Sequence, residues 1–382
     1  MKFKSTLFVS AIIVLAGQNG YAREQAPMVE AGIWKGTLGN NQILVCFPRL
    51  RNISVYSQYL YYRYGEPILL SRDSDKAADI WQEGDQISPS GLWKLTEKNP
   101  RTITGIWTDS KIHKTLSIRL DRYYLQPEAI VKSCEGLKGL KYLEKYLEKH
   151  PSFNWGEVQT RAGVTYQEIS ALGGAIRSFK LFGDSPGLTE INNGLKQAML
   201  TDMAANLECL ADAGSKEGKW KARTSPKYKV SHYLATSQVA DFYCGGANSS
   251  NDIVKHQAWD LNTGQAIKLW DFISDRKNIP NTDSYRPGEK LTGLITDIIE
   301  KHPSRYKNAQ NCLGAEDPEN EWQIGLGKNG FIFRQSFNHA TQSCEDDVEV
   351  SYSALAPFLT KEGAKFVREI THRSEMKFTY ME

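Results

Sequence analysis

The stretch YKVSHYLATSQVADFYCGGANSSNDIVKHQAWDLNTGQAIKLWDF, residues 228–272, decides the fold of the C-terminal half of the chain. Apolar and polar residues alternate along it in four segments, as they do in half-buried strands. These segments are residues 228–235, 238–244, 254–261 and 265–270. Glycines at 245–246 end the second segment, and Asn262-Thr263-Gly264 joins the last two, because turns need residues that tolerate unusual backbone angles. We therefore predict an antiparallel meander.

Amphipathic helices are predicted on either side of this meander. One begins after Ser185-Pro186 and places apolar residues on one face as far as Gly214. Another covers residues 289–302 and ends before Pro303. Further strands are predicted at residues 321–326, 331–337 and 348–352. The C-terminal half is thus expected to be α+β, with helices packed on an antiparallel sheet.

The order of these motifs resembles the C-terminal domain of RsiV-type anti-sigma factors, which also accompanies peptidoglycan deacetylases of the PdaC type. The resemblance covers residues 164–367. It is carried by Gly245-Gly246-Ala247-Asn248, Trp259-Asp260-Leu261-Asn262-Thr263-Gly264 and Leu269-Trp270-Asp271-Phe272. Domains of that type usually have a histidine where this chain has Asn248. Because the domain binds lysozyme in that family, the resemblance implies recognition of a protein in the cell envelope.

The first 22 residues are typical of a secretory signal peptide. Lys2 and Lys4 precede an apolar run at residues 7–16, and small residues at 20 and 22 suit cleavage after Ala22. The apolar run is shorter than the roughly 20 residues that a membrane-spanning helix needs. We therefore expect a periplasmic or secreted protein with no membrane span after signal removal.

Six cysteines in an exported chain favour three disulfides, because the count is even and the compartment is oxidising. No Cys-x-x-Cys motif occurs, so neither a zinc site nor thioredoxin-like chemistry is indicated. Pairing within the predicted domains gives Cys46–Cys134, Cys209–Cys244 and Cys312–Cys344.

The predicted domains are a β-rich unit at residues 23–135, a helical linker at 136–163 and the RsiV-like unit at 164–382. A glycine-x-tryptophan unit occurs three times in the first of them, as Gly32-Ile33-Trp34, Gly91-Leu92-Trp93 and Gly105-Ile106-Trp107. Such units predict an antiparallel, barrel-like meander with aromatic residues in its core. We expect the linker helix, which alternates Lys and Glu around an apolar stripe, to be solvated.

A cluster of tyrosines at positions 56, 59, 61, 62 and 64 lies within the first domain. We interpret the cluster as packing on the barrel core. The alternative is a sugar-binding or partner-binding face, since tyrosine offers a flat ring and a polar tip.

Candidate catalytic residues are few. His232, Asp241, Asn248, His256 and Asp260 could converge as a general base or metal site, but we interpret them as ordinary strand and turn residues. By the same reasoning we expect Asp271 to be a helix cap, and the acidic residues 345–349 to form a solvated loop. No metal or other cofactor is expected.

Two further features bear on ligands. Glu83, near Trp81, has the carboxylate–aromatic pairing of glycan-handling proteins, yet lacks the second carboxylate that hydrolysis requires. With 47 basic and 44 acidic residues, the chain gives no electrostatic case for nucleic-acid binding.

The leading hypothesis is a soluble, non-enzymatic binding protein that recognises or inhibits a peptidoglycan-cleaving enzyme such as lysozyme, or a delivered toxin. The residues expected to make contact are Tyr243, Gly245, Gly246, Asn248 and Trp259. The alternative is a protein that binds cell-wall glycan, or an envelope hydrolase, with peptidoglycan as the ligand. The sequence leaves the partner and the oligomeric state open.

Overall fold

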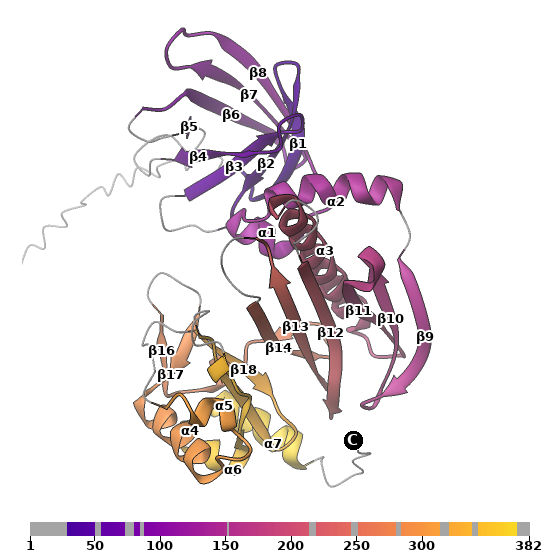
Figure 1. Ribbon diagram of the computed structural model, residues 1–382, viewed down its shortest axis with the longest axis vertical. Coiled ribbons are helices and arrows are strands. Elements are labelled where there is room, and N and C mark those ends of the chain that lie inside the picture. Colours follow the sequence, from indigo (N-terminus) through magenta and orange to yellow (C-terminus); the bar gives the residue numbers. More distant parts are fainter. Residues whose placement is uncertain are drawn as a thin grey trace, which may run out of the picture.

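The computed structural model describes residues 29–49, 55–72, 80–84, 88–150, 153–213, 219–245, 251–279, 284–313, 321–337 and 343–372. It combines an N-terminal β-barrel, a seven-stranded sheet with a long helix, and a C-terminal layer of short helices and strands (Figure 1). The predicted α+β class is confirmed. The predicted signal peptide, residues 1–22, lies outside the described residues.

Eight antiparallel strands form the closed barrel, each bonded to its neighbour in sequence, and the last strand pairs with the first. They are β1 (Gly32–Leu38), β2 (Asn41–Phe47), β3 (Val55–Tyr61), β4 (Pro67–Arg72), β5 (Ile80–Glu83), β6 (Gly91–Asn99), β7 (Thr102–Asp109) and β8 (Thr115–Arg122). Buried aromatic residues, including Trp34, Trp81 and Trp93, fill the interior. An eight-stranded barrel is narrow enough for side chains to fill it, which confirms the predicted aromatic core.

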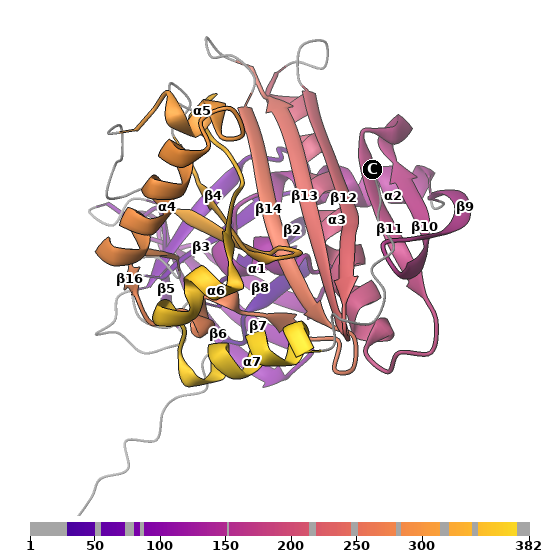
Figure 2. The same ribbon diagram turned by 90° about the horizontal axis from the view of Figure 1, so that it is seen from below.

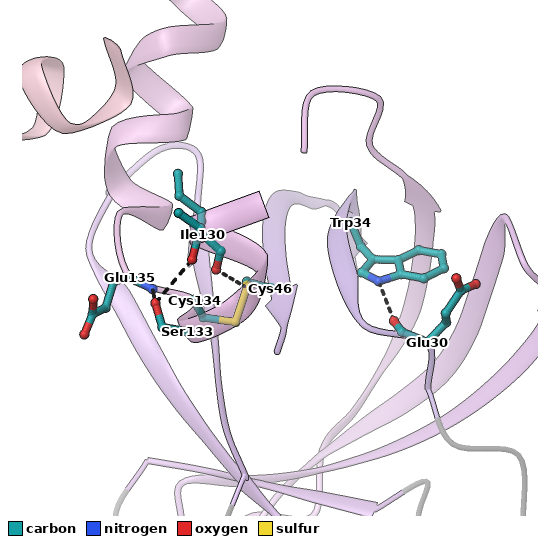
Figure 3. The surroundings of a disulfide bond; sticks show 8 residues. Glu30, Trp34, Cys46, Ile130, Ser133, Cys134 and Glu135 are labelled. Atoms are coloured by element: carbon teal, nitrogen blue, oxygen red, sulfur yellow. Dashed lines mark hydrogen bonds between the residues drawn. A yellow bond between two sulfur atoms is a disulfide. The ribbon is translucent and has the colours of Figure 1, made fainter. Parts of the chain in front are cut away.

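Strand β2 is buried on both faces. Ile43 and Val45 belong to the barrel core, whereas Leu44 and Cys46 belong to a second core outside the barrel. Two helices, α1 (Glu128–Ser133) and α2 (Leu137–Lys149), contribute to this outer core, and the Cys46–Cys134 disulfide ties α1 to β2 (Figure 3).

The structure corrects the expectation that α2 is a solvated linker. Leu137, Leu140 and Leu143 are buried in the outer core, between the barrel wall and the long helix α3 (Leu188–Asp212). The apolar stripe of α2 explains this placement, because both neighbours present apolar side chains to it. The second half of the predicted linker is strand β9.

The seven-stranded sheet has the order β15-β14-β13-β12-β11-β10-β9. Its strands are β9 (Asn154–Arg161), β10 (Val164–Ala171), β11 (Ile176–Phe182), β12 (Lys219–Val230), β13 (Tyr233–Tyr243), β14 (Asn251–Asp260) and β15 (Ala266–Ile267). A short 3-10 helix, η1 (Leu172–Gly174), joins β10 to β11. The first three strands, β9–β11, were not predicted from the sequence.

The first hairpin turn was predicted wrongly, between residues 235 and 238. The turn lies at Ser231-His232, where Ser231 has a φ of 54°. No glycine marks this position, so the alternating pattern gave no signal of it.

The sheet is mixed rather than antiparallel, because β11 and β12 run parallel and are connected through α3. They pair only at Ile176–Ala222 and Arg177–Arg223. Farther along β11, the side chain of Asn192 on α3 replaces the missing strand. Its Oδ1 accepts a hydrogen bond from the Leu181 amide at 2.8 Å, and its Nδ2 donates to the Leu181 carbonyl at 3.1 Å.

The C-terminal layer follows the sheet in sequence. It consists of η2 (Leu269–Phe272), β16 (Arg276–Asn278), β17 (Tyr285–Pro287), α4 (Glu289–Lys301), α5 (Lys307–Gln310), β18 (Trp322–Leu326), β19 (Gly330–Gln335), β20 (Val348–Ser351), α6 (Tyr352–Leu355), η4 (Ala356–Phe358) and α7 (Lys361–His372). This layer lies beside β14 (Figure 2). Its core includes Val230, Tyr233 and Ala258 of the sheet, so layer and sheet are packed together.

Three disulfides are present, Cys46–Cys134, Cys209–Cys244 and Cys312–Cys344. These are the pairs predicted from the sequence. Because disulfides persist in oxidising compartments, they indicate an extracytoplasmic location. None of the helices in the described part of the chain combines the length and the apolar character that a membrane crossing requires.

Candidate functional site

Of the predicted binding loop, the structure describes the residues at the end of β13, as far as Gly245. Tyr243 ends the strand, and Cys244 is bonded to Cys209 near the end of α3. Gly245 has a φ of 92°, and a Cβ there would lie 3.3 Å from the Cα of Ala213, the residue that follows α3. The loop therefore starts from a point fixed against the helix. Gly246 and Asn248 lie outside the described residues.

Trp259 is not brought to this loop. It pairs with Leu234, whereas Phe242, next to Tyr243, pairs with Asn251. Eight residues of extended strand separate the two positions, about 26 Å at 3.3 Å per residue. The indole packs on α3, where a Cβ on Gly194 would lie 2.8 Å from it. Trp259 therefore supports the contact between sheet and helix, at a distance from Tyr243.

The Asp-Leu-Asn-Thr-Gly motif also has a structural role. Asp260 Oδ1 accepts a hydrogen bond from the Asn262 amide at 2.8 Å, which stabilises the turn as expected for that carboxylate. Gly264 has a φ of 76°, and a Cβ there would lie 2.5 Å from the carbonyl oxygen of Gly187, just before α3. The motif thus places the β14–β15 turn against the start of α3.

The histidine constellation does not converge. His232 Nε2 lies 3.9 Å from Asp260 Oδ1, but His256 contacts Asp347, with 3.0 Å between Nε2 and Oδ1. Asp241 forms an ion pair with Lys219. Asn248, the remaining member, lies outside the described residues.

The acidic residues 345–349 are not a solvated loop, which corrects the expectation. Glu345 pairs with Arg334 at 2.9 Å, and Asp346 accepts a hydrogen bond from the Ala309 amide at 2.9 Å. Asp347 also pairs with Arg334, and Glu349 with Arg305 at 3.4 Å. These carboxylates connect the elements of the C-terminal layer.

The expectation that Asp271 caps a helix is wrong as well. Asp271 pairs with Arg276, with 2.8 Å between Oδ1 and Nη1. The N-cap position of η2 is Lys268, and no side chain caps it.

A second candidate centre lies inside the barrel, at Glu83. This carboxylate is only 6% exposed and accepts four hydrogen bonds from side chains. The donors are Tyr59 Oη at 2.8 Å, Trp93 Nε1 at 3.0 Å and Trp107 Nε1 at 2.8 Å, all to Oε2, and Ser90 Oγ at 2.8 Å to Oε1. Burial and the charge of Glu83 raise the pKa of Tyr59, which keeps its hydroxyl protonated as a donor.

Two of the three glycine-x-tryptophan units meet at this centre. A Cβ on Gly91 would lie 2.1 Å from Nε1 of Trp107, so only glycine lets that indole cross β6 to reach Glu83. The tryptophan of the remaining unit, Trp34, donates instead to the carbonyl of Glu30 at 3.2 Å (Figure 3). The repeated unit signalled the two indoles, but nothing in the sequence indicated that they share one carboxylate.

The tyrosine cluster divides between several environments. Tyr59 lies in the barrel core, as predicted, and Tyr61 packs at its margin. Tyr62 points outward and donates to Glu144 of α2. Tyr56 and Tyr64 are 46% and 68% exposed. Only part of the cluster therefore belongs to the core, and Tyr56 and Tyr64 are exposed.

Within the described ranges, no three His, Cys, Asp or Glu side chains are grouped so that they could hold a metal ion.

Comparisons with known proteins do not assign the chain to a family. No protein-family model matches the sequence, and no curated protein matches it. The structure is similar to a DUF3298 family protein from Pseudomonas aeruginosa PAO1, with 13% sequence identity and a TM-score of 0.32, over 55% of this chain and 92% of that chain. A TM-score this low carries no argument about function.

Proposed function

We propose that the chain is an exported, non-enzymatic binding protein that recognises a protein of the cell envelope, such as a peptidoglycan-cleaving enzyme or a delivered toxin. The Cys209–Cys244 disulfide carries the proposal, because it fixes the start of the loop at Gly245 against the end of α3. A loop that begins from a fixed point loses less conformational freedom on association. The resemblance to the RsiV-type domain supplies the class of partner.

The roles of the charged residues support binding over catalysis. His256, Asp347 and Arg334 form one structural network, and Asp241 pairs with Lys219. Groups held in this way stabilise contacts between elements. These contacts account for the charged residues as structural groups, without a catalytic role.

The test is a binding experiment with the oxidised mature protein. Lysozyme and a bacterial envelope extract serve as sources of partner, and Tyr243→Ala and Asn248→Arg alter the proposed loop. Tyr124→Ala is the matched control, since Tyr124 is 96% exposed outside the loop. We expect the loop variants to weaken retention of a wall hydrolase or toxin by about tenfold, as loss of a contact residue does.

The control should bind as the unchanged protein does. Equal binding by all variants would contradict the proposed site. Thermal unfolding of each variant separates a lost contact from a lost fold.

The second candidate function, glycan binding, is favoured by the exposed ring of Tyr64 in the turn between β3 and β4. The rings of Tyr64 and Tyr61 are in contact, and Tyr61 in turn contacts Tyr59, which bonds to Glu83. A sugar could stack on the exposed Tyr64. Retention on insoluble peptidoglycan that Tyr64→Ala abolishes, together with no protein partner, would favour this function over the first.

A further inference from the structure

The seven-stranded sheet has one long free edge, strand β9. At the opposite edge, β15 has only two residues, whereas β9 has eight. β9 lies at the outer side of the molecule in both views (Figure 1, Figure 2). Among the described strands, β10 alone pairs with it. The other side of β9 therefore presents backbone N–H and C=O groups that can pair with a further strand.

The side chains of β9 leave this edge open. All eight residues are exposed, and they include two large apolar side chains, Trp155 at 50% and Val158 at 57%. Natural sheet edges are commonly blocked by proline or by lysine. β9 contains neither of them, and its charged residues are one of each sign, Glu157 and Arg161. Pairing with another strand is therefore not prevented by the residues of the edge.

The turn to β10 determines which backbone groups of β9 face outward. Ala162 and Gly163 have φ values of 57° and 73°, as in the two-residue turns that join hairpin strands. Arg161 therefore belongs to the hydrogen-bonded pair that closes the turn. Hydrogen-bonded and non-hydrogen-bonded pairs alternate along an antiparallel ladder. Thr160 and Val158 are thus the residues that direct their N–H and C=O groups to the free side.

The length of edge that a partner strand can follow is limited at both ends. The register between β9 and β10 shifts between Gln167 and Ile169, which places a bulge at residues 156–157. At the other end, the turn begins at Ala162. A partner strand can therefore follow β9 from about residue 157 to residue 161, and the midpoint of this segment is Gln159.

Charge complementarity identifies the strand that fits this edge as a second copy of β9. When two β9 strands pair antiparallel about Gln159, Val158 of each copy lies opposite Thr160 of the other, so their outward groups meet. The same register places Glu157 of each copy opposite Arg161 of the other, and opposite charges that face each other across a ladder are stabilising. An arginine has five N–H donors, so Arg161 can bond to this carboxylate and keep its other contacts.

We propose that the chain forms a two-fold symmetric dimer in which two β9 strands pair antiparallel about Gln159, so that the sheets of both copies become one. A register moved by two residues in either direction would separate Glu157 from Arg161, so the charges select a single register. Two-fold pairing occupies the free edge of both copies, and the assembly closes at two. Because the ladder is short, the dimer is weak and reversible.

Sedimentation velocity of the oxidised mature chain over a range of concentrations tests the proposal. We expect a reversible equilibrium between monomer and dimer. Thr160→Pro should weaken the dimer roughly a hundredfold, because it removes an outward N–H from each copy and its ring obstructs the partner strand. Thr160→Val is the matched control. It also removes the hydroxyl that lies 2.9 Å from Thr165 Oγ1, but it keeps the N–H, and it should dimerise as the unchanged chain does.

Charge reversal tests the register. Glu157→Arg places like charges opposite each other and should weaken the dimer roughly tenfold. Adding Arg161→Glu to the same chain restores opposite charges, and the dissociation constant should return to within about threefold of the unchanged value. Lys221→Glu, at an exposed position of the central strand β12, is the control and should leave dimerisation unchanged.

Thermal unfolding establishes that each variant is folded. If Thr160→Pro does not fold, hydrogen exchange of the Thr160 amide in the unchanged chain replaces it, and this exchange should slow as the protein concentration rises. Exchange that is independent of concentration would overturn the proposal.

Three other outcomes would also overturn it. The first is a chain that stays monomeric at the highest concentration measured. The second is a dimer that folded Thr160→Pro leaves intact, which would place the contact on another surface. The third is a loss in Glu157→Arg that the second reversal does not restore. If a monomeric chain binds an envelope protein less well as Thr160→Pro, the edge receives a strand of that protein instead of a second copy.

Discussion

The barrel and the sheet each bury a carboxylate, and they satisfy it differently. Glu83 in the barrel accepts hydrogen bonds from four side chains. Asp202 on α3, 7% exposed, accepts a hydrogen bond from Gln238 Nε2 at 2.6 Å. Burial raises the pKa of Asp202 to about 6, although Gln238 and the charge of Lys255 act to lower it. A buried carboxylate therefore needs hydrogen-bond donors around it if its charge is to be accommodated.

The largest effect is expected for Glu83→Ala. The substitution leaves Tyr59, Trp93 and Trp107 without their shared acceptor, and we expect a loss of about 4 kcal/mol in the free energy of unfolding. Urea unfolding followed by tryptophan fluorescence measures it. Glu66→Ala, at a glutamate whose side chain is 72% exposed, should cost less than about 1 kcal/mol. Similar losses for both would show that the barrel centre is not special.

Gly91→Ala tests the route by which Trp107 reaches Glu83. The added Cβ would displace the indole, and we expect a loss of about 3 kcal/mol from overpacking and a broken hydrogen bond. Gly293→Ala in α4 is the control, because a Cβ there meets nothing within 4 Å. That substitution should instead stabilise by about 0.5–1 kcal/mol. Equal stability of Gly91→Ala and the unchanged protein would refute the steric argument.

Asp202→Asn tests the effect of burying a carboxylate that has fewer hydrogen-bond donors than Glu83. Because the pKa of about 6 in the folded state lies above the ordinary aspartate value of 3.8, the folded state binds the proton more tightly. Stability should therefore be greatest below about pH 4, fall as pH rises through 6, and then level off, by about 2–3 kcal/mol in total.

In Asp202→Asn this slope should disappear, leaving the variant more stable than the unchanged protein at pH 8. Asp297→Asn, at a side chain that is 61% exposed, should keep the slope. Thermal unfolding from pH 4 to 8 supplies the measurement. A slope that persists in Asp202→Asn would assign it to other groups.

The smallest effect concerns Asn192. Its side chain hydrogen-bonds to the backbone of Leu181 in β11, where β11 and β12 no longer pair. Asn192→Ala removes both hydrogen bonds to Leu181 and should cost about 1–2 kcal/mol. Hydrogen exchange of the Leu181 amide should accelerate. Asn308→Ala, where the side chain bonds to Asp346 at an exposed position, should leave that amide unchanged. Unaltered exchange at Leu181 in Asn192→Ala would mean that water can replace the side chain.

The sequence predicted those elements of the fold that depend on residues close together in the chain. The glycine-x-tryptophan units indicated the barrel, and the α4 stripe indicated a helix close to its observed bounds, Glu289–Lys301. Pairing the cysteines within the predicted domains gave the observed disulfides. Strand β9 was missed because all eight of its residues are exposed and show no apolar alternation. Strands β10 and β11 alternate only in part.

The candidate site was harder to predict than the fold. Contacts such as His256–Asp347 join residues 91 positions apart, and Trp107–Glu83 joins different strands through one glycine. Spacing in the sequence carries no signal of such meetings. Trp259 was taken for a binding residue because its motif was recognised, whereas the structure shows that the motif positions a turn against α3.

The apolar outer face of the barrel at β2 has a practical consequence for mapping the function. Leu44, Leu60 and Cys46 of the barrel share a core with α2 and α3. A fragment of residues 23–135 would expose this apolar wall to water, and its self-association could be mistaken for ligand binding. The ligand should therefore be assigned with single substitutions in the whole mature chain rather than by dissecting it into halves.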